Sequence, residues 1–210
     1  MIEYVIAQNP DDRILKKASK ILADGGLVCL PTDTNWVVTA DPLSKHGIEK
    51  LYRFKHAEAD KHFSVLCDAI STAAAIAEIG DSTFRMLRGR VPGNFTFIFK
   101  ARKSIRKKLS ASKRDQEIGV RFPPSILVQR LVALHGRGLL SSNITPEMLG
   151  LKDREMAIYG NLIEETLSND IALVLDPGEF EFAGESTIVS LVDGGDPVIL
   201  RQGAGRWEEP

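Results

Sequence analysis

Five short polar segments contain the side chains best suited to chemistry, and each lies beside an apolar run typical of a strand. Their hydroxyl, amide and cationic groups could bind an anionic nucleotide and an amino acid together at the rim of a sheet. The sequence therefore predicts a small-molecule site. The segments are Pro31-Thr32-Asp33-Thr34, Lys55 with Lys61, Gly119-Val120-Arg121, Ser141-Ser142-Asn143, and Ser186-Thr187 with Arg201.

Each segment also has a simpler structural interpretation. Residues Pro31 to Thr34 can form an Asx or ST turn that only reverses the chain. Arg121 can pair with a surface acid, and the segment from Ser141 to Asn143 can cap a helix or a turn. Trp36 can stack on a flat ligand, but we expect it to lie in the core.

Hydrophobic periodicity places these segments on alternating helices and strands. Asp11 or Asp12 can cap a helix whose apolar residues share one face, and Gly25-Gly26 ends that helix before the first strand. The turn-rich residues 193–197 separate two apolar runs and predict a β-hairpin, so the sheet should contain antiparallel pairs. We expect further helices at 44–54, 71–79, 81–90, 125–134 and 159–167, and strands at 27–30, 36–40, 63–67, 95–99, 118–122, 139–141, 171–175, 187–192 and 198–201.

Length and composition bound the fold class. The chain has 210 residues, of which 43% are hydrophobic, so we predict a single domain over residues 1–210. Its expected fold is α/β, with a twisted sheet of parallel and antiparallel strands flanked by helices. Cys29 and Cys67 lack a CxxC spacing and the four histidines lack metal-like spacing, so neither a disulfide nor a metal site is expected. Without a secretory leader or an apolar stretch of about 20 residues, we expect a cytoplasmic protein with no membrane partner.

The net charge of −1 conceals a division along the chain. Residues 1–146 contain 23 Lys or Arg against 14 Asp or Glu, whereas residues 147–210 contain 4 against 14. Within the first part, residues 100–114 carry eight cations and no acid, and they could contact RNA phosphates or form a solvated helix face. The candidate nucleic-acid contacts are Arg102, Lys103, Arg106, Lys107, Lys108, Lys113 and Arg114.

Taken together, the polar segments resemble the motifs of the YrdC/YciO superfamily, which has the fold of the threonylcarbamoyl-AMP synthases. Its members carry, in order, Pro-Thr-Asp-Thr, Lys-Gly-Arg-Pro-x-x-Lys-Pro, Pro-Gly-x-x-Thr, Val-Arg-x-Pro, Ser-x-Asn, Ser-Thr-Val-Val and Arg-x-Gly. The same order holds here from residue 14 to residue 205, and details such as residues 61–67 are more similar to the YciO branch. The counterparts are Pro31-Thr32-Asp33-Thr34, Lys55 with Lys61, Pro92-Gly93-Asn94-Phe95-Thr96, Val120-Arg121-Phe122-Pro123, Ser141-Ser142-Asn143, Ser186-Thr187-Ile188-Val189 and Arg201-Gln202-Gly203.

The resemblance implies a reaction and a role for each segment. In the synthases the amine of threonine captures bicarbonate, and the carbamate oxygen then attacks the α-phosphate of ATP, bound with Mg²⁺, and expels pyrophosphate. By resemblance, Lys55 and Lys61 would be catalytic and contact the phosphates, while Asn143 and Arg201 would bind the nucleotide. No tightly bound cofactor is implied. L-threonine would be held by Thr32, Thr34, Arg121, Ser141 and Ser186, with Arg121 as a bidentate fork on its carboxylate.

The chain departs from the superfamily pattern at the phosphate-binding segment. The arginine of Lys-x-Arg is Ala57, and the proline after Lys61 is His62. Loss of one transition-state donor costs about 10² to 10³ in rate in other enzymes, so a weak or altered activity is expected.

Two function classes stay open at this point. The first is a threonylcarbamoyl-adenylate synthase-like protein that binds ATP or AMP and L-threonine. The alternative is a non-catalytic protein that binds double-stranded RNA or tRNA through the basic concave face associated with the superfamily. Binding that depends steeply on salt and on residues 100–114 would favour the alternative.

Overall fold

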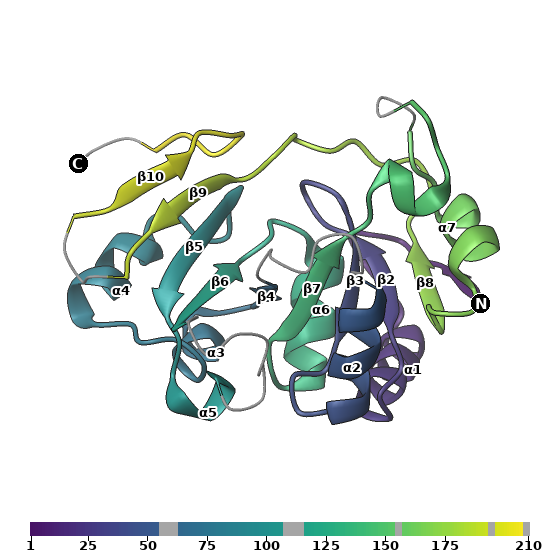
Figure 1. Cartoon of the computed structure of the whole chain (residues 1–210), viewed down its shortest axis with the longest axis horizontal. Coiled ribbons are helices and arrows are strands. Elements are labelled where there is room, and N and C mark those ends of the chain that lie inside the picture. Colours follow the sequence, from purple (N-terminus) through teal and green to yellow (C-terminus); the bar gives the residue numbers. More distant parts are fainter. Residues whose placement is uncertain (55–62, 107–115, 154–156, 193–195, 208–210) are drawn as a thin grey trace.

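The computed structural model describes residues 1–54, 63–106, 116–153, 157–192 and 196–207, and in this part of the chain the strands form one ten-stranded sheet. The strand order is β1-β8-β2-β3-β7-β4-β6-β5-β9-β10, so β1 and β10 are the edges (Figure 1). The strands are β1 (Ile2–Tyr4), β2 (Val28–Pro31), β3 (Trp36–Ala40), β4 (Ser64–Leu66), β5 (Phe95–Lys100), β6 (Glu117–Arg121), β7 (Leu139–Asn143), β8 (Leu173–Asp176), β9 (Thr187–Ser190) and β10 (Val198–Arg201).

The sheet contains both kinds of ladder, as the sequence predicts. Parallel ladders join β1 with β8, β8 with β2, β4 with β6, and β5 with β9. Antiparallel ladders join β2 with β3, β3 with β7, β7 with β4, β6 with β5, and β9 with β10. In the last of these, Val198 lies opposite Ser190, which confirms the antiparallel pair predicted near the end of the chain.

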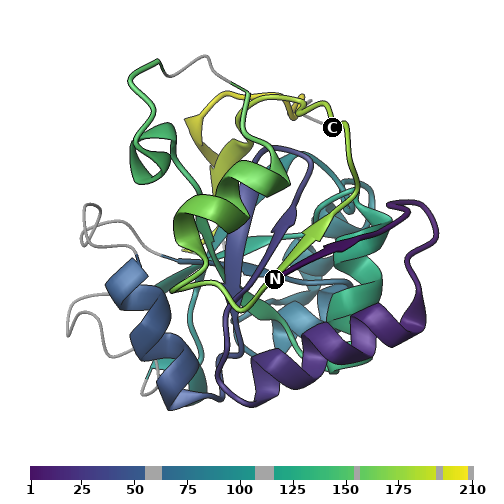
Figure 2. The ribbon, with the colours of Figure 1, turned by 90° about the vertical axis from the view of Figure 1, so that its right-hand side faces the viewer.

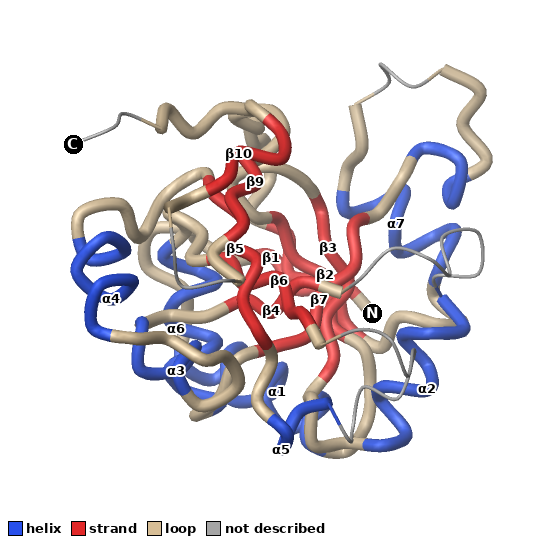
Figure 3. The backbone as a smooth tube through the Cα atoms, turned by 60° about the vertical axis from the view of Figure 1, so that its left-hand side comes forward, coloured by secondary structure: helices blue, strands red, loops and turns tan. Residues whose placement is uncertain are grey.

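Helices cover both sides of the sheet (Figures 2 and 3). In Figure 3, α3, α4 and α6 lie on one side, and α2 and α7 lie on the other. Helix α1 packs with α6 over β2 and β8 in a cluster of buried aliphatic side chains. Among the described residues, none of the helices has both the length and the apolar character needed to cross a membrane. The helices are α1 (Asp12–Ala23), α2 (Lys45–Phe54), α3 (Ile70–Ala74), α4 (Asp81–Arg88), α5 (Lys103–Arg106), α6 (Ile126–His135), the 3₁₀ helix η1 (Pro146–Leu149) and α7 (Gly160–Leu167).

Local capping signals set the ends of the two helices that pack together. The Asp11 carboxylate accepts a hydrogen bond from the Arg13 backbone N–H at 2.7 Å and caps α1, and Gly25, with φ of +82°, follows its end. Ser125 caps α6, and Gly136 ends it in the left-handed conformation that glycine adopts at little cost. Both helices therefore lie within about a residue of their predicted bounds.

One strand and two helices are among the elements that differ from the sequence prediction. Strand β1 was not expected, because its three residues are too few to show an alternating pattern. Helix α3 is shorter than the predicted 71–79, because Ala77 leaves the helix to form an antiparallel bridge with Ala101. Residues 146–149, which lie in none of the predicted helices or strands, form the short helix η1.

The aromatic residues of β3 and β5 and the two cysteines are buried. Trp36 is 2% exposed, and Phe97 and Phe99 are fully buried, so the core interpretation of Trp36 is confirmed. Cys29 and Cys67 are free thiols in the interior, and burial raises the pKa of both. Both thiols are therefore kept protonated at neutral pH.

Candidate functional site

The structure brings six of the predicted ligand-binding residues together around one pocket of about 490 Å³. They come from the β2–β3 turn, the ends of β6 and β7, the start of β9 and the end of β10. Segments that are up to 167 positions apart in the sequence therefore converge, as the motif analysis predicts. The six residues are Thr34, Arg121, Ser141, Asn143, Ser186 and Arg201.

Strand register explains the polar wall of this pocket. Thr96 of β5 lies opposite Arg121 of β6, and Ser64 of β4 lies opposite Ser141 of β7. Paired residues on neighbouring strands share a face of the sheet, whereas consecutive residues alternate between faces. Phe97, the neighbour of Thr96, accordingly points to the other face and into the core. The same strands thus supply apolar packing on one face and ligand-binding groups on the other.

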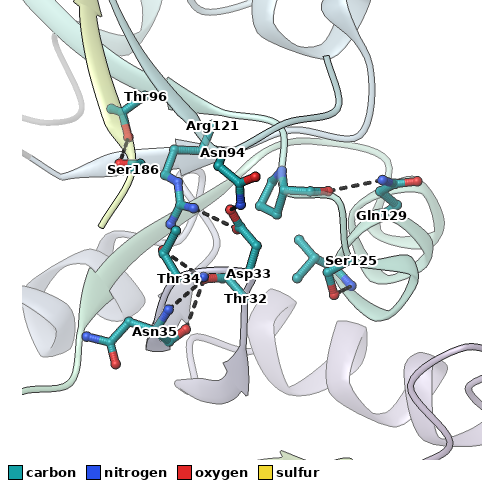
Figure 4. A network of polar contacts seen from close by, with 12 residues as sticks. Thr32, Asp33, Thr34, Asn35, Asn94, Thr96, Arg121, Ser125, Gln129 and Ser186 are labelled. Carbon is teal, nitrogen blue, oxygen red and sulfur yellow. Dashed lines mark hydrogen bonds and ion pairs between the residues drawn. The ribbon is translucent and has the colours of Figure 1, made fainter. Parts of the chain in front are cut away.

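Asp33 is the buried centre of a hydrogen-bond network beside the pocket (Figure 4). Its Oδ1 accepts from Arg121 Nη2 at 2.7 Å, and its Oδ2 accepts from Asn94 Nδ2 at 2.7 Å. Its backbone carbonyl accepts from the Ala183 N–H at 2.8 Å. The Asp33 and Arg121 side chains are only 5% and 7% exposed. Asp33 therefore ties the β2–β3 turn to β6, to the residue before β5 and to the chain that leads into β9.

The Arg121 guanidinium has a buried donor without an acceptor. Its Nε is buried and has no hydrogen-bond partner among the described residues. Burial lowers the pKa of this guanidinium and the charge of Arg201 lowers it further, while Asp33 acts in the opposite direction. Because arginine titrates far above neutral pH, the group still carries its charge. A buried charged donor without an acceptor is costly, so the pocket is suited to an anion next to Nε.

The partner of Arg121 is thus a buried acid rather than the surface acid of the simpler interpretation. One of its nitrogens, Nη2, already donates to Asp33. The predicted bidentate fork on a ligand carboxylate stays a prediction for the other N–H groups of the guanidinium, of which Nε is buried without an acceptor among the described residues.

Thr32 does not line the pocket, and the prediction that it contacts a ligand is corrected by its burial. Its Oγ1 donates to the Asn35 carbonyl at 2.9 Å and accepts from the Thr34 N–H at 3.2 Å. The side chain is completely buried. The turn interpretation of this segment is therefore right for Thr32, whereas Thr34 lines the pocket.

Ser186 and Arg201 form a second polar group at the pocket. The Ser186 and Thr96 hydroxyls are 2.8 Å apart, and Arg201 Nη2 donates to the Ser186 carbonyl at 2.8 Å. Arg201 Nη1 also lies 3.1 Å from Glu185 Oε1, but the Glu185 side chain is 76% exposed. An exposed ion pair of this kind is worth little, so an incoming anion can compete with Glu185 for Arg201.

The Ser-x-Asn segment is the end of a strand and not a helix cap. Ser141 Oγ donates to the Ser64 carbonyl at 3.0 Å, and Asn143 is exposed at the last position of β7. The following residues are fixed by Asn35, whose Nδ2 donates to the Ile144 carbonyl at 3.1 Å. Asn143 is therefore presented to the pocket by a firmly paired strand.

A second pocket, of about 480 Å³, adjoins the first through a shared wall of Thr34, Asn35, Ile144 and Pro146. Trp36 lines this second pocket, but its Nε1 donates to the Ile158 carbonyl at 2.9 Å. The indole is thus held in place by its own hydrogen bond and forms part of the boundary.

Several predicted residues lie outside the described part of the chain. These are Lys55 and Lys61, the departures Ala57 and His62, and four of the basic residues. Their roles therefore stay predictions from the motif pattern. The four basic residues are Lys107, Lys108, Lys113 and Arg114.

The described part of the basic stretch lies at the other end of β5 from the pocket. Arg102 and Lys103 are exposed, and Arg106 is half-buried. They follow Lys100, which ends β5, whereas Thr96 lines the pocket near the start of that strand. Four residues of strand correspond to about 13 Å. The described part of the basic stretch and the pocket are therefore separate on the surface.

Several polar residues of the site, among them Thr96, Ser64 and Asn94, were not identified as ligand-binding or supporting residues from the sequence. Thr96 and Ser64 line the pocket, and Asn94 supports Asp33. The alternation of apolar and polar residues in 95–99 would have placed Thr96 on the non-core face. No sequence signal would have paired Asn94 with Asp33, because they are 61 positions apart.

Comparison with known proteins is consistent with this arrangement. The Sua5_yciO_yrdC family, described as telomere recombination, matches residues 20–203. The chain belongs to the Sua5/YciO/YrdC family. Among curated members of the family, an uncharacterized protein from Haemophilus influenzae is 27% identical, and the uncharacterized protein YciO from Escherichia coli K12 is 26% identical. Each alignment covers 96% of this chain and 95% of the relative.

More distant members of the family have a named activity. The threonylcarbamoyl-AMP synthase of Pyrococcus abyssi is 21% identical over 93% of this chain, but the match covers only 55% of that relative. The family members whose names state an activity thus have low sequence identity to this chain.

Solved structures of the family confirm the predicted fold. The crystal structure of E. coli YciO has a TM-score of 0.83 at 26% identity, with 98% of this chain and 97% of that chain covered. The crystal structure of P. abyssi Sua5 complexed with L-threonine has a TM-score of 0.80 at 21% identity, with 97% of this chain and 57% of that chain covered.

Proposed function

We propose that this family member binds ATP and L-threonine in the pocket and catalyses adenylate formation of the threonylcarbamoyl-AMP synthase type, at a reduced or altered rate. The observation that carries the proposal is the buried Arg121 guanidinium, whose Nε has no partner among the described residues and which lines a pocket walled by hydroxyls. An amino-acid carboxylate is a small anion that would satisfy this donor. The hydroxyls of Thr34 and Ser186 would receive the ammonium or the side-chain hydroxyl.

The nucleotide would occupy the mouth of the same pocket. Arg201 and Asn143 line it, and Arg201 is held by the Ser186 carbonyl, with the exposed Glu185 as its charged partner among the described residues. By motif, Lys55 and Lys61 would contact the phosphates, and Mg²⁺ would enter as part of the ATP substrate. In-line displacement at phosphorus depends mainly on such cations, so Ala57 in place of arginine supports a weakened reaction.

The comparisons support the amino-acid part of the proposal. The fold is similar to that of P. abyssi Sua5, which was crystallised with L-threonine. The relatives with 26–27% identity are uncharacterized, and their names give no reaction. The proposed reaction is therefore argued from the residues of the site.

A second candidate function is binding of double-stranded RNA or tRNA. Arg102 and Lys103 are exposed next to a run of further cations in the sequence, away from the pocket. This function would use phosphate contacts and would not require Arg121.

A pyrophosphate-release assay tests the proposed reaction. The protein is incubated with ATP, Mg²⁺, bicarbonate and each amino acid in turn, and release that depends on threonine is the expected result. The variant Ala57→Arg with His56→Gly and His62→Pro should release more pyrophosphate, because it restores a cation for the developing charge. If no amino acid stimulates release by either protein, the proposed reaction is wrong.

A further inference from the structure

Asn94 occupies a position that the Pro-Gly-x-x-Thr pattern leaves unspecified, yet it is hydrogen-bonded to the centre of the site. Its Nδ2 donates to Asp33 Oδ2 at 2.7 Å, and its carbonyl accepts from the Thr187 N–H at 3.0 Å. The backbone of Asn94 is therefore fixed by the start of β9, and its side chain reaches across to the β2–β3 turn (Figure 4). Asn94 itself does not line the pocket.

Asn94 and Arg121 bond to different oxygens of the Asp33 carboxylate. Arginine and carboxylate groups frequently pair through two parallel hydrogen bonds, which is the stronger arrangement. Here Asp33 bonds to Arg121 only through Oδ1, at 2.7 Å from Nη2, while Oδ2 accepts from Asn94 and is held toward it. The Arg121 Nε consequently remains without an acceptor among the described residues.

We propose that Asn94 is a positioning residue that keeps Arg121 Nε available for the carboxylate of the bound amino acid. Without the Asn94 amide, Asp33 Oδ2 would lose its donor in a nearly water-free site, and rotation of the carboxylate onto Nε would satisfy both groups. Asp33 would then occupy the ligand's place on Arg121. This inference rests on the proposed function, since the ligand is the amino acid proposed above.

This role predicts an unusual combination of effects. Asn94→Ala should weaken binding of L-threonine by about 10- to 100-fold, the equivalent of one hydrogen bond to a charged group. Binding of Mg²⁺-ATP should stay within about twofold of the parent, because Arg201 does not contact Asn94. Thermal stability should change little, because the new Asp33–Arg121 bond replaces the lost one.

The experiment measures both affinities by calorimetry for the parent and for Asn94→Ala, Asp33→Asn and the double variant. An asparagine at position 33 carries no charge and cannot form the competing ion pair, so Asn94→Ala should have little further effect on threonine binding in that background. The matched control is Gln129→Ala, which removes an amide donor to the Pro123 carbonyl at 3.0 Å without contacting Asp33. The control should bind threonine like the parent.

The ¹H–¹⁵N signal of Arg121 Nε separates this inference from the proposed function. In the ligand-free parent the signal should differ from that in Asn94→Ala, where Nε is bonded to Asp33. Identical signals, unchanged threonine affinity in Asn94→Ala, or equal losses of threonine and nucleotide binding would each overturn the positioning role. If the parent does not bind threonine at all, the proposed function fails, and the Nε signal alone decides whether Asn94 controls Arg121.

Discussion

The imidazole Nε2 of His135 lies 3.4 Å from Oδ2 of Asp41, and both side chains are at most 3% exposed. Arg137 Nη1 donates to the same oxygen at 2.8 Å, and the Leu43 N–H donates to Oδ1 at 2.7 Å. On the other side of the ring, Nδ1 lies 2.9 Å from the Ser19 hydroxyl. This cluster joins the end of β3 to α6 and α1, at the opposite end of β3 from the pocket.

The stability of the protein should fall in acid because of Asp41. Burial raises the pKa of this carboxyl, but its contacts with His135, the Leu43 N–H and Arg137 lower it by more, so the net pKa lies below the ordinary value of 3.8. The stabilisation is complete above the unfolded pKa and is lost as the pH falls through the lower folded pKa. Urea unfolding between pH 5 and pH 2.5 should show this loss. Asp41→Asn should have a lower free energy of unfolding than the parent at neutral pH, and this free energy should fall less steeply as the pH decreases. The exposed Asp196→Asn should behave like the parent in both respects. Equal slopes for all three proteins would contradict the prediction.

Removal of Arg121 should destabilise the fold as well as abolish threonine binding. The variant Arg121→Met leaves the Asp33 carboxylate buried without its cation, and breaking a buried pair in this way costs about 3–5 kcal/mol. In an Asp33→Asn background the same change should cost clearly less, because no charge is left unpaired. Free energies of unfolding from a double-mutant cycle measure the difference. Strict additivity of the two substitutions would show that the pair is not coupled.

Gly203 should not tolerate a side chain, although its backbone φ is not in the left-handed region. A Cβ at this position would overlap the Glu185 carbonyl and lie 2.7 Å from the Ser186 backbone. Gly203→Ala should therefore push the segment after β10 away from Ser186 and destabilise the protein by about 1–3 kcal/mol. The matched control is Gly89→Ala, where a Cβ meets no atom within 4 Å. Thermal unfolding of the two variants checks the prediction, and equal melting temperatures would be inconsistent with it.

If residues 100–114 bind RNA, the affinity of the protein for RNA should depend on salt concentration and should not depend on the residues of the pocket. Lys107→Glu with Lys108→Glu should weaken binding to a duplex of about 16 base pairs, and log affinity should fall linearly with log salt concentration. Lys16→Glu with Lys45→Glu, two exposed lysines on α1 and α2, is the charge-matched control. Fluorescence anisotropy at several salt concentrations measures both. A flat salt slope, or equal binding by the double variant and the control, would leave residues 100–114 as a solvated surface.

The motifs predicted the position of the site because polar residues at the ends of apolar runs must meet at the rim of a sheet. Arg121, Ser141 and Ser186 are each directly attached to a strand whose pattern is readable, so their places beside strands could be predicted, whereas the strand order that brings them together could not. The hydroxyl of Thr32 was misassigned because a short turn can use such a group internally, and nothing in the sequence distinguishes the two uses.

The pairing of side chains across the sheet could not be predicted in the same way. Asp33 and Arg121 are 88 positions apart, and their contact depends on the register of several intervening ladders. A shift of one residue in any of them would turn Arg121 to the other face. The buried Nε of Arg121, which has no acceptor among the described residues, is the strongest indication of a ligand, and it could be identified only from the structure.

The most direct test of the proposed site is a calorimetric titration of the parent protein with L-threonine and with L-threoninamide, in the presence of Mg²⁺-ATP. The two ligands differ only in the carboxylate that Arg121 is proposed to bind. L-threonine should bind, and the amide should bind at least about tenfold more weakly, because it offers no charged acceptor to the buried Nε. Equal affinities for the two ligands, or no heat with L-threonine, would contradict the proposed role of Arg121 and with it the amino-acid pocket.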